Sequence, residues 1–154
     1  MNSRDEEAAG QGRDPRKRSV DGDYRRAPVW VAGLVLAASV VPVPPWPGAG
    51  GGTLPLPTWI GPTAPFHLIG YAALAAFAGR AVAGSEGRTV IAAAVGVAVA
   101  TAFGFEVELV QAPIPWRSFA WIDAAINAVG AVVGAGIFGV WRTRRENEDR
   151  EEVR

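Results

Sequence analysis

The sequence predicts an all-α fold: an integral membrane bundle of four transmembrane helices, with both termini cytoplasmic and disordered charged tails. Charge is the first observation behind this prediction. Of the Lys, Arg, Asp and Glu residues, 13 lie in residues 1–26, ten in residues 142–154 and only seven in the region between. A soluble domain needs charge along its whole surface, so this region is too apolar for one. We therefore divide the chain into a charged N-terminal tail (1–27), a transmembrane domain (28–141) and a charged C-terminal tail (142–154).

Four apolar stretches are the second observation. A helix needs about 20 apolar residues, roughly 17 to 25, to cross the hydrocarbon core of a bilayer. Four such helices in so short a region would leave no polar faces to meet water in a soluble protein. The predicted spans are residues 28–43, 64–83, 89–111 and 119–141.

Arginine and lysine predict the orientation, because cytoplasmic loops are enriched in both. Basic residues precede the first span, flank the connection between the second and third, and follow the fourth, whereas loop 44–63 carries no charge and loop 112–118 only Arg117. Both termini are therefore predicted to be cytoplasmic in a multi-pass cell-membrane protein. Indole rings favour membrane interfaces. The predicted outer belt is Trp46, Trp59, Trp116 and Trp121, and the inner belt is Trp30 and Trp141.

A cleaved secretory signal is the alternative for the start of the chain. Arg25 and Arg26 precede a short apolar run, as twin arginines do in some signals. The run ends in VPVPPWP and not in a small-x-small cleavage site, which favours a membrane span.

Composition excludes several function classes. The formal net charge is zero, so no nucleic-acid partner is expected. The absence of cysteine excludes disulfides, thiolate catalysis and cysteine-ligated metals. No cofactor is predicted, and one histidine with two carboxylates is thin evidence for a metal.

Polar residues gather at the predicted outer ends of the second, third and fourth spans. A carboxylate at the centre of a membrane helix costs about 2.5 to 3.5 kcal/mol, which favours a functional role for such a group. Glu108 and Gln111 are three residues apart and share a helix face, whereas Glu106 lies about 200° from Glu108 around a 3.6-residue helix. Glu108 is therefore predicted to point inward and Glu106 is not. The candidate site is His67, Tyr71, Glu108, Gln111, Arg117, Asp123 and Asn127.

The fourth span also contains a GxxxG pair. Gly130 and Gly134 continue the face of Asp123 and Asn127 at helical spacing. Glycines so spaced let a neighbouring backbone come close. The polar face and the packing face are therefore predicted to coincide, which turns the polar residues into the bundle and away from lipid.

These motifs resemble those of the VanZ-like membrane proteins. Two motifs carry the resemblance: E-L-V-Q-x-x-x-P-x-R-S-x-x-x-x-D-x-x-x-N-x-x-G-x-x-x-G, from Glu108 to Gly134, and HLIGYAAL, from His67 to Leu74. The resemblance covers residues 28–141 and implies an integral membrane protein whose recurring polar residues are the seven of the candidate site. Family members place Asp-Lys just before the histidine, where this chain has Thr63 and Ala64. The family is named for low-level teicoplanin resistance, and its mechanism is not established.

Three hypotheses for the function follow. The first is recognition or handling of an outer-leaflet lipid, an envelope precursor or another amphiphile, by a protein in the lipid bilayer that can also oligomerise. The second is an enzyme in which Glu108, Asp123 and His67 act as acid and base groups. The third is a purely structural role, in which the polar residues hydrogen-bond the helices together.

Overall fold

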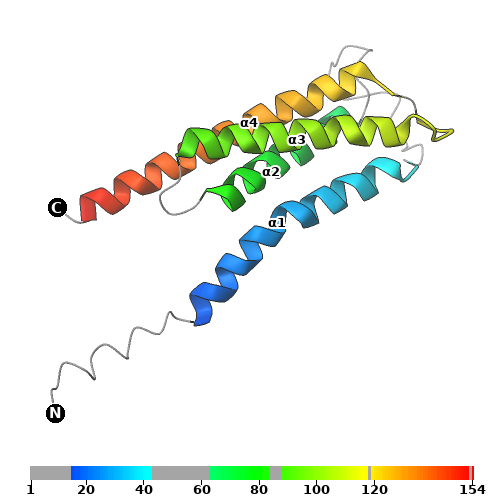
Figure 1. The fold of residues 1–154 in the computed structure, drawn as a ribbon. Helices are drawn as coiled ribbons and strands as arrows, with labels where there is room; N and C mark the ends of the chain where they lie inside the picture. Colours follow the sequence, from blue (N-terminus) through cyan, green and yellow to red (C-terminus); the bar gives the residue numbers. More distant parts are fainter. Residues whose placement is uncertain (1–14, 43–62, 84–87, 118, 153) are drawn as a thin grey trace.

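A computed structural model describes residues 15–42, 63–83, 88–117, 119–152 and 154. In these residues the chain is entirely α-helical outside turns, which agrees with the predicted fold class (Figure 1). The predicted tryptophans Trp46 and Trp59 lie outside the described residues. The helices are α1 (Pro15–Val40), α2 (Ala64–Val82), α3 (Thr89–Gln111) and α4 (Trp121–Glu152).

The four helices run up and down alternately, so the start of α1 and the end of α4 lie at the same end of the bundle (Figure 1). Helices α2, α3 and α4 all pack on one another, whereas α1 packs mainly on α2 and touches α3 only slightly. We call the end where α3 ends and α4 begins the turn end, and the opposite end, from which α1 and α4 extend, the tail end.

Small residues lie where the helix backbones meet in the bundle. A Cβ on Gly134 would collide with the carbonyl oxygen of Ala72, and one on Gly130 would lie 2.5 Å from that of Leu68, so α4 meets the backbone of α2 directly. Gly96 of α3 faces the carbonyl oxygen of Ala75 on α2 in the same way. Close backbone approach through small residues is the usual packing of membrane helices.

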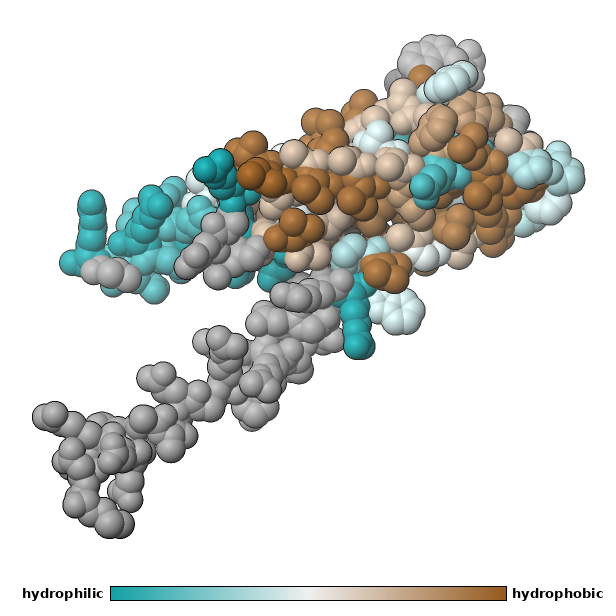
Figure 2. Space-filling view, in the orientation of Figure 1, coloured by the Kyte–Doolittle hydropathy of each residue, from teal (hydrophilic) through white to brown (hydrophobic). Residues whose placement is uncertain are grey.

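Large apolar side chains face outward. Val90 is 79% exposed and Phe66 is 76% exposed, and many Val, Leu and Ile side chains of α3 and α4 are about half exposed. Apolar side chains cover the visible side of the bundle, and hydrophilic ones gather on the C-terminal part of α4 (Figure 2). Soluble monomers rarely expose an apolar surface of this extent.

Two helices of the described part of the chain, α3 and α4, are long and apolar enough to cross a membrane. Helix α2 has 19 residues but includes His67 and Arg80, and the apolar part of α1 is the shorter segment Arg26–Val40. The four predicted spans are thus found as helices, and two of them meet the requirement for a span by length and composition.

The predicted disorder of the tails is wrong where the structure describes them. Helix α4 continues through residues 142–152, and α1 begins at Pro15 and continues through Pro28. An existing helix extends without the cost of a new nucleus, and Arg142 Nε lies 2.8 Å from Glu146 Oε1 in a favourable i, i+4 pair. Pro15 occupies the first helical position, where its missing N–H is tolerated. Residues 1–14 lie outside the described part.

Candidate functional site

A hydrogen bond between α2 and α4 lies at the turn end. His67 Nδ1 donates to Asn127 Oδ1 over 3.0 Å, which requires the ring proton on Nδ1. His67 is 7% exposed and Asn127 is completely buried. The bond lies one turn from the contact of Gly130 with α2, so close packing of the two backbones brings these side chains together.

Glu108 connects α3 to the segment before α4. Its Oε2 accepts a hydrogen bond from the backbone N–H of Ala120 over 3.1 Å, and the residue has no exposed surface. Glu106, two positions earlier, is exposed. The two carboxylates therefore face opposite environments, as the helical angle predicts.

Gln111 connects α3 to α1. Its Nε2 donates to the backbone carbonyl oxygen of Ser39 over 2.9 Å, and its side chain is buried. Ser39 is near the C-terminal end of α1, where carbonyl groups have no partner within the helix. This bond fastens the end of α1 to the turn end of the bundle.

Three buried polar atoms at the turn end have no hydrogen-bond partner among the described residues: Tyr71 Oη, Glu108 Oε1 and Asn127 Nδ2. Asn127 Nδ2 and the Tyr71 ring lie beside Gly104, since a Cβ there would lie 3.1 Å from both Asn127 Nδ2 and Tyr71 Cε1. Glu108 is one turn further along α3 and interacts electrostatically with Tyr71. A buried polar atom left unpaired costs about 1 to 3 kcal/mol, so a polar partner that hydrogen-bonds to these three atoms would be stabilising.

Arg117 and Asp123 lie at the margin of this cluster and are partly exposed. Both interact electrostatically with Glu108, as does His67. Arg117 forms no ion pair with either carboxylate in the part of the chain that the structure describes. Asp123 is in the first turn of α4, where the helix dipole favours a negative charge. The structure thus brings all seven candidate residues to one end, five of them buried and two at the edge.

Three contributors are additional to those predicted from the sequence. Ser39 and Ala120 take part through backbone atoms, which side-chain chemistry does not reveal. Gly104 does carry a signal: Ala92, Gly96, Ala100 and Gly104 recur every four residues up to Glu108, and all are buried. The spacing of small residues therefore points along α3 to the inward carboxylate.

The described residues contain no group of three or more His, Asp and Glu side chains placed as ligands of one metal ion. The five buried candidate residues supply a phenol, a carboxylate, two amides and an imidazole, which are the groups of a hydrogen-bonding site. Comparison with known proteins returned no matching family model, no matching curated protein and no matching solved structure.

Proposed function

We propose that the chain is a VanZ-like integral membrane protein that spans the cell membrane four times, with both termini cytoplasmic. Its site at the turn end recognises or handles an amphiphile of the outer leaflet, such as a lipid or an envelope precursor. The motifs from His67 to Leu74 and from Glu108 to Gly134 support the family assignment.

Membrane insertion is supported by the distribution of side chains. Small residues lie where the helix backbones meet and many large apolar residues point outward, which is the packing expected when lipid surrounds the bundle. Helix α3, with 23 residues, is about 35 Å long at 1.5 Å per residue, enough for a bilayer core of about 30 Å. The shared position of the start of α1 and the end of α4 is consistent with both termini on one side (Figure 1).

The observation that carries the functional proposal is the set of three unpartnered buried atoms at the turn end. Asn127 Nδ2 is a donor, Glu108 Oε1 is an acceptor and Tyr71 Oη is both. A hydroxyl or amide of a glycan, peptide or lipid headgroup can donate and accept at once, and so complements this set. Arg117 and Asp123, at the partly exposed margin, are placed to meet the charged part of such a molecule first.

The test uses conservative substitutions that keep side-chain volume. Tyr71→Phe removes only the unpartnered hydroxyl, and Glu108→Gln keeps an oxygen able to accept from Ala120. Glu106→Gln is the matched control, an exposed carboxylate on the same helix. Expressed in a teicoplanin-sensitive Gram-positive host, the wild type should lower susceptibility to teicoplanin. Y71F and E108Q should abolish that effect at normal membrane abundance, and E106Q should keep it.

Structural clamping is the second candidate function, favoured by the hydrogen bonds that tie α2 to α4, α3 to α1 and α3 to the residue before α4. It predicts that Y71F has wild-type activity, because Tyr71 Oη takes part in none of them. If Y71F and E108Q both lower teicoplanin susceptibility as much as the wild-type protein does, that result would contradict the binding proposal and favour the clamp.

A further inference from the structure

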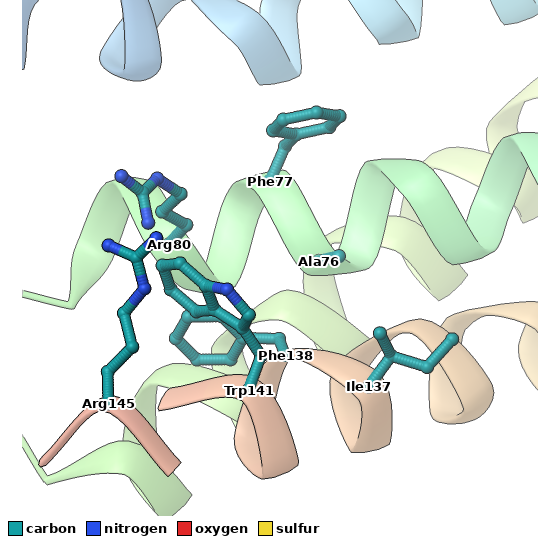
Figure 3. A pocket seen from close by; sticks show the side chains of 7 residues that line it. All are labelled: Ala76, Phe77, Arg80, Ile137, Phe138, Trp141 and Arg145. Carbon is teal, nitrogen blue, oxygen red and sulfur yellow. The ribbon is translucent and has the colours of Figure 1, made fainter. Parts of the chain in front are cut away.

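An open hollow of about 300 Å³ lies between α2 and α4 at the tail end, opposite the candidate site. Phe77 and Ile137 line it on the side nearer the middle of the bundle, and Arg80, Trp141 and Arg145 line it towards the tail end, where the Phe138 ring lies beside Trp141 (Figure 3). Its volume is at the lower limit of the roughly 300 to 1,000 Å³ of ligand pockets.

Two arginines converge on one tryptophan in this hollow. Cζ of Arg80 lies 4.8 Å from the centroid of the Trp141 ring, and Cζ of Arg145 lies 4.4 Å from it. Both guanidinium groups are on the same side of the hollow in Figure 3. Guanidinium N–H donors from two helices therefore line the same hollow, and a phosphate oxyanion can accept hydrogen bonds from both.

The lining changes from apolar to cationic along the helix axes. Along α2, Phe77 precedes Arg80 by one turn, and along α4, Ile137 precedes Trp141 and Arg145 by one and two turns. A phospholipid has the same order, with acyl chains, then glycerol, then phosphate. Arginine and tryptophan at such a depth match the headgroup level of a bilayer.

We propose that this hollow binds one anionic phospholipid of the cytoplasmic leaflet. Its phosphate lies between Arg80 and Arg145, and its glycerol and upper acyl chain lie against Ile137 and Phe138. A free phosphate ion would gain nothing from these apolar residues, so the lining favours a lipid. The proposal rests on the membrane insertion and orientation proposed above, which place the tail end in the anionic cytoplasmic leaflet.

Neighbouring arginines provide the control. Arg142 pairs with Glu146 at 2.8 Å, whereas Arg145 has no ion pair among the described residues and lines the hollow. Arg144 is exposed, adjacent in sequence, and not among the lining residues. Arg145→Gln and Arg144→Gln therefore remove the same charge from the same helix, one inside the hollow and one outside it.

Native mass spectrometry of the full chain in detergent measures the binding directly, by titration with phosphatidylglycerol or phosphatidylcholine. R145Q should weaken phosphatidylglycerol binding about ten-fold or more, as loss of a charged hydrogen bond does. R144Q should weaken it about five-fold or less, the effect of a single juxtamembrane charge. Phosphatidylcholine binding should change little in either variant. Trp141→Leu should also weaken phosphatidylglycerol binding, since it removes the ring that holds both arginines.

Equal loss in R144Q and R145Q would overturn the proposal in favour of a diffuse basic surface. Displacement of phosphatidylglycerol by inorganic phosphate would overturn the assignment to a lipid. Circular dichroism of R145Q should match the wild type. If R145Q is misfolded, Arg145→Lys replaces it in the test: this variant keeps the charge and should retain much of the phosphatidylglycerol binding. These outcomes are independent of the teicoplanin assay, so failure here leaves the site at the turn end untouched, and the reverse also holds.

Discussion

The two ends of the α2–α4 interface place polar groups in opposite ways. At the turn end, His67 and Asn127 are buried and bonded to each other across 3.0 Å. At the tail end, Arg80 and Arg145 lie over Trp141 around an open hollow. The first set pairs an imidazole with an amide, and the second combines two guanidinium groups with an indole.

The sizes of the α4 residues along this interface explain the difference. Beside the turn end, Gly130 and Gly134 let α4 approach the backbone of α2, so side chains between the helices are enclosed. Further along, bulky Phe138 and Trp141 replace the glycines, and a hollow forms beside them. The size of the residues on one face of α4 thus decides whether polar groups are enclosed between the helices or line an open hollow.

The largest expected effect comes from filling the space at Gly134 that lets α4 contact the backbone of α2. Gly134→Ala places a Cβ against the carbonyl oxygen of Ala72, so the helices must separate. Overpacking of this kind costs about 1 to 3 kcal/mol, and it should also loosen the His67–Asn127 bond. The melting temperature in detergent and the abundance in membranes measure the loss.

Gly136→Ala is the matched control, because a Cβ there would have nothing within 4 Å. Alanine is the better helix former by up to about 1 kcal/mol, so this variant should be neutral or slightly more stable. Equal melting temperatures of the two variants would show that backbone contact through Gly134 does not organise the turn end.

A smaller effect separates the buried pair from an exposed one. A double-mutant cycle with His67→Ala and Asn127→Ala should give a coupling of about 0.6 kcal/mol, with about 1.7 as the maximum known for membrane helices. The same cycle on Arg142 and Glu146, at 2.8 Å on the exposed part of α4, should give about 0.3 to 0.5 kcal/mol. Thermal unfolding of the four single and two double variants supplies both numbers. A larger coupling for the exposed pair would contradict the account of the His67–Asn127 bond as an enclosed interhelical contact.

Much of the helical frame was predictable from apolar runs and their boundaries. The third predicted span has the bounds of α3, residues 89–111, and the second differs from α2 by one residue. Gly84, Gly87 and Arg88 separate the two runs, and Pro113 and Pro115 follow the second of them, so these boundaries are clear. The inward direction of Glu108 also followed from helical spacing, which puts it on the face of Gln111 and away from Glu106.

Other features depend on interactions that a hydropathy pattern does not contain. A hydropathy pattern separates residues suited to water from residues suited to lipid, but it does not separate helix from coil. The continuation of α4 through residues 142–152 was therefore not predicted. The bond from Gln111 to Ser39 depends on where α1 ends, at Val40 and not at the predicted Val43. The pairing of Arg80 with Arg145 around Trp141 joins residues of two helices whose contact only the packing reveals.

The central claim is that the turn end faces outward and the tail end faces the cytoplasm, and cysteine labelling in intact cells tests it most directly. The chain has no cysteine, so each substitution introduces a single thiol. A membrane-impermeant maleimide should label Thr63→Cys and Ala112→Cys at the turn end in intact cells. It should label Ala83→Cys and Glu148→Cys at the tail end only after permeabilisation. Labelling of Ala83→Cys or Glu148→Cys in intact cells, or protection of Ala112→Cys, would contradict the four-span topology and with it the outward site.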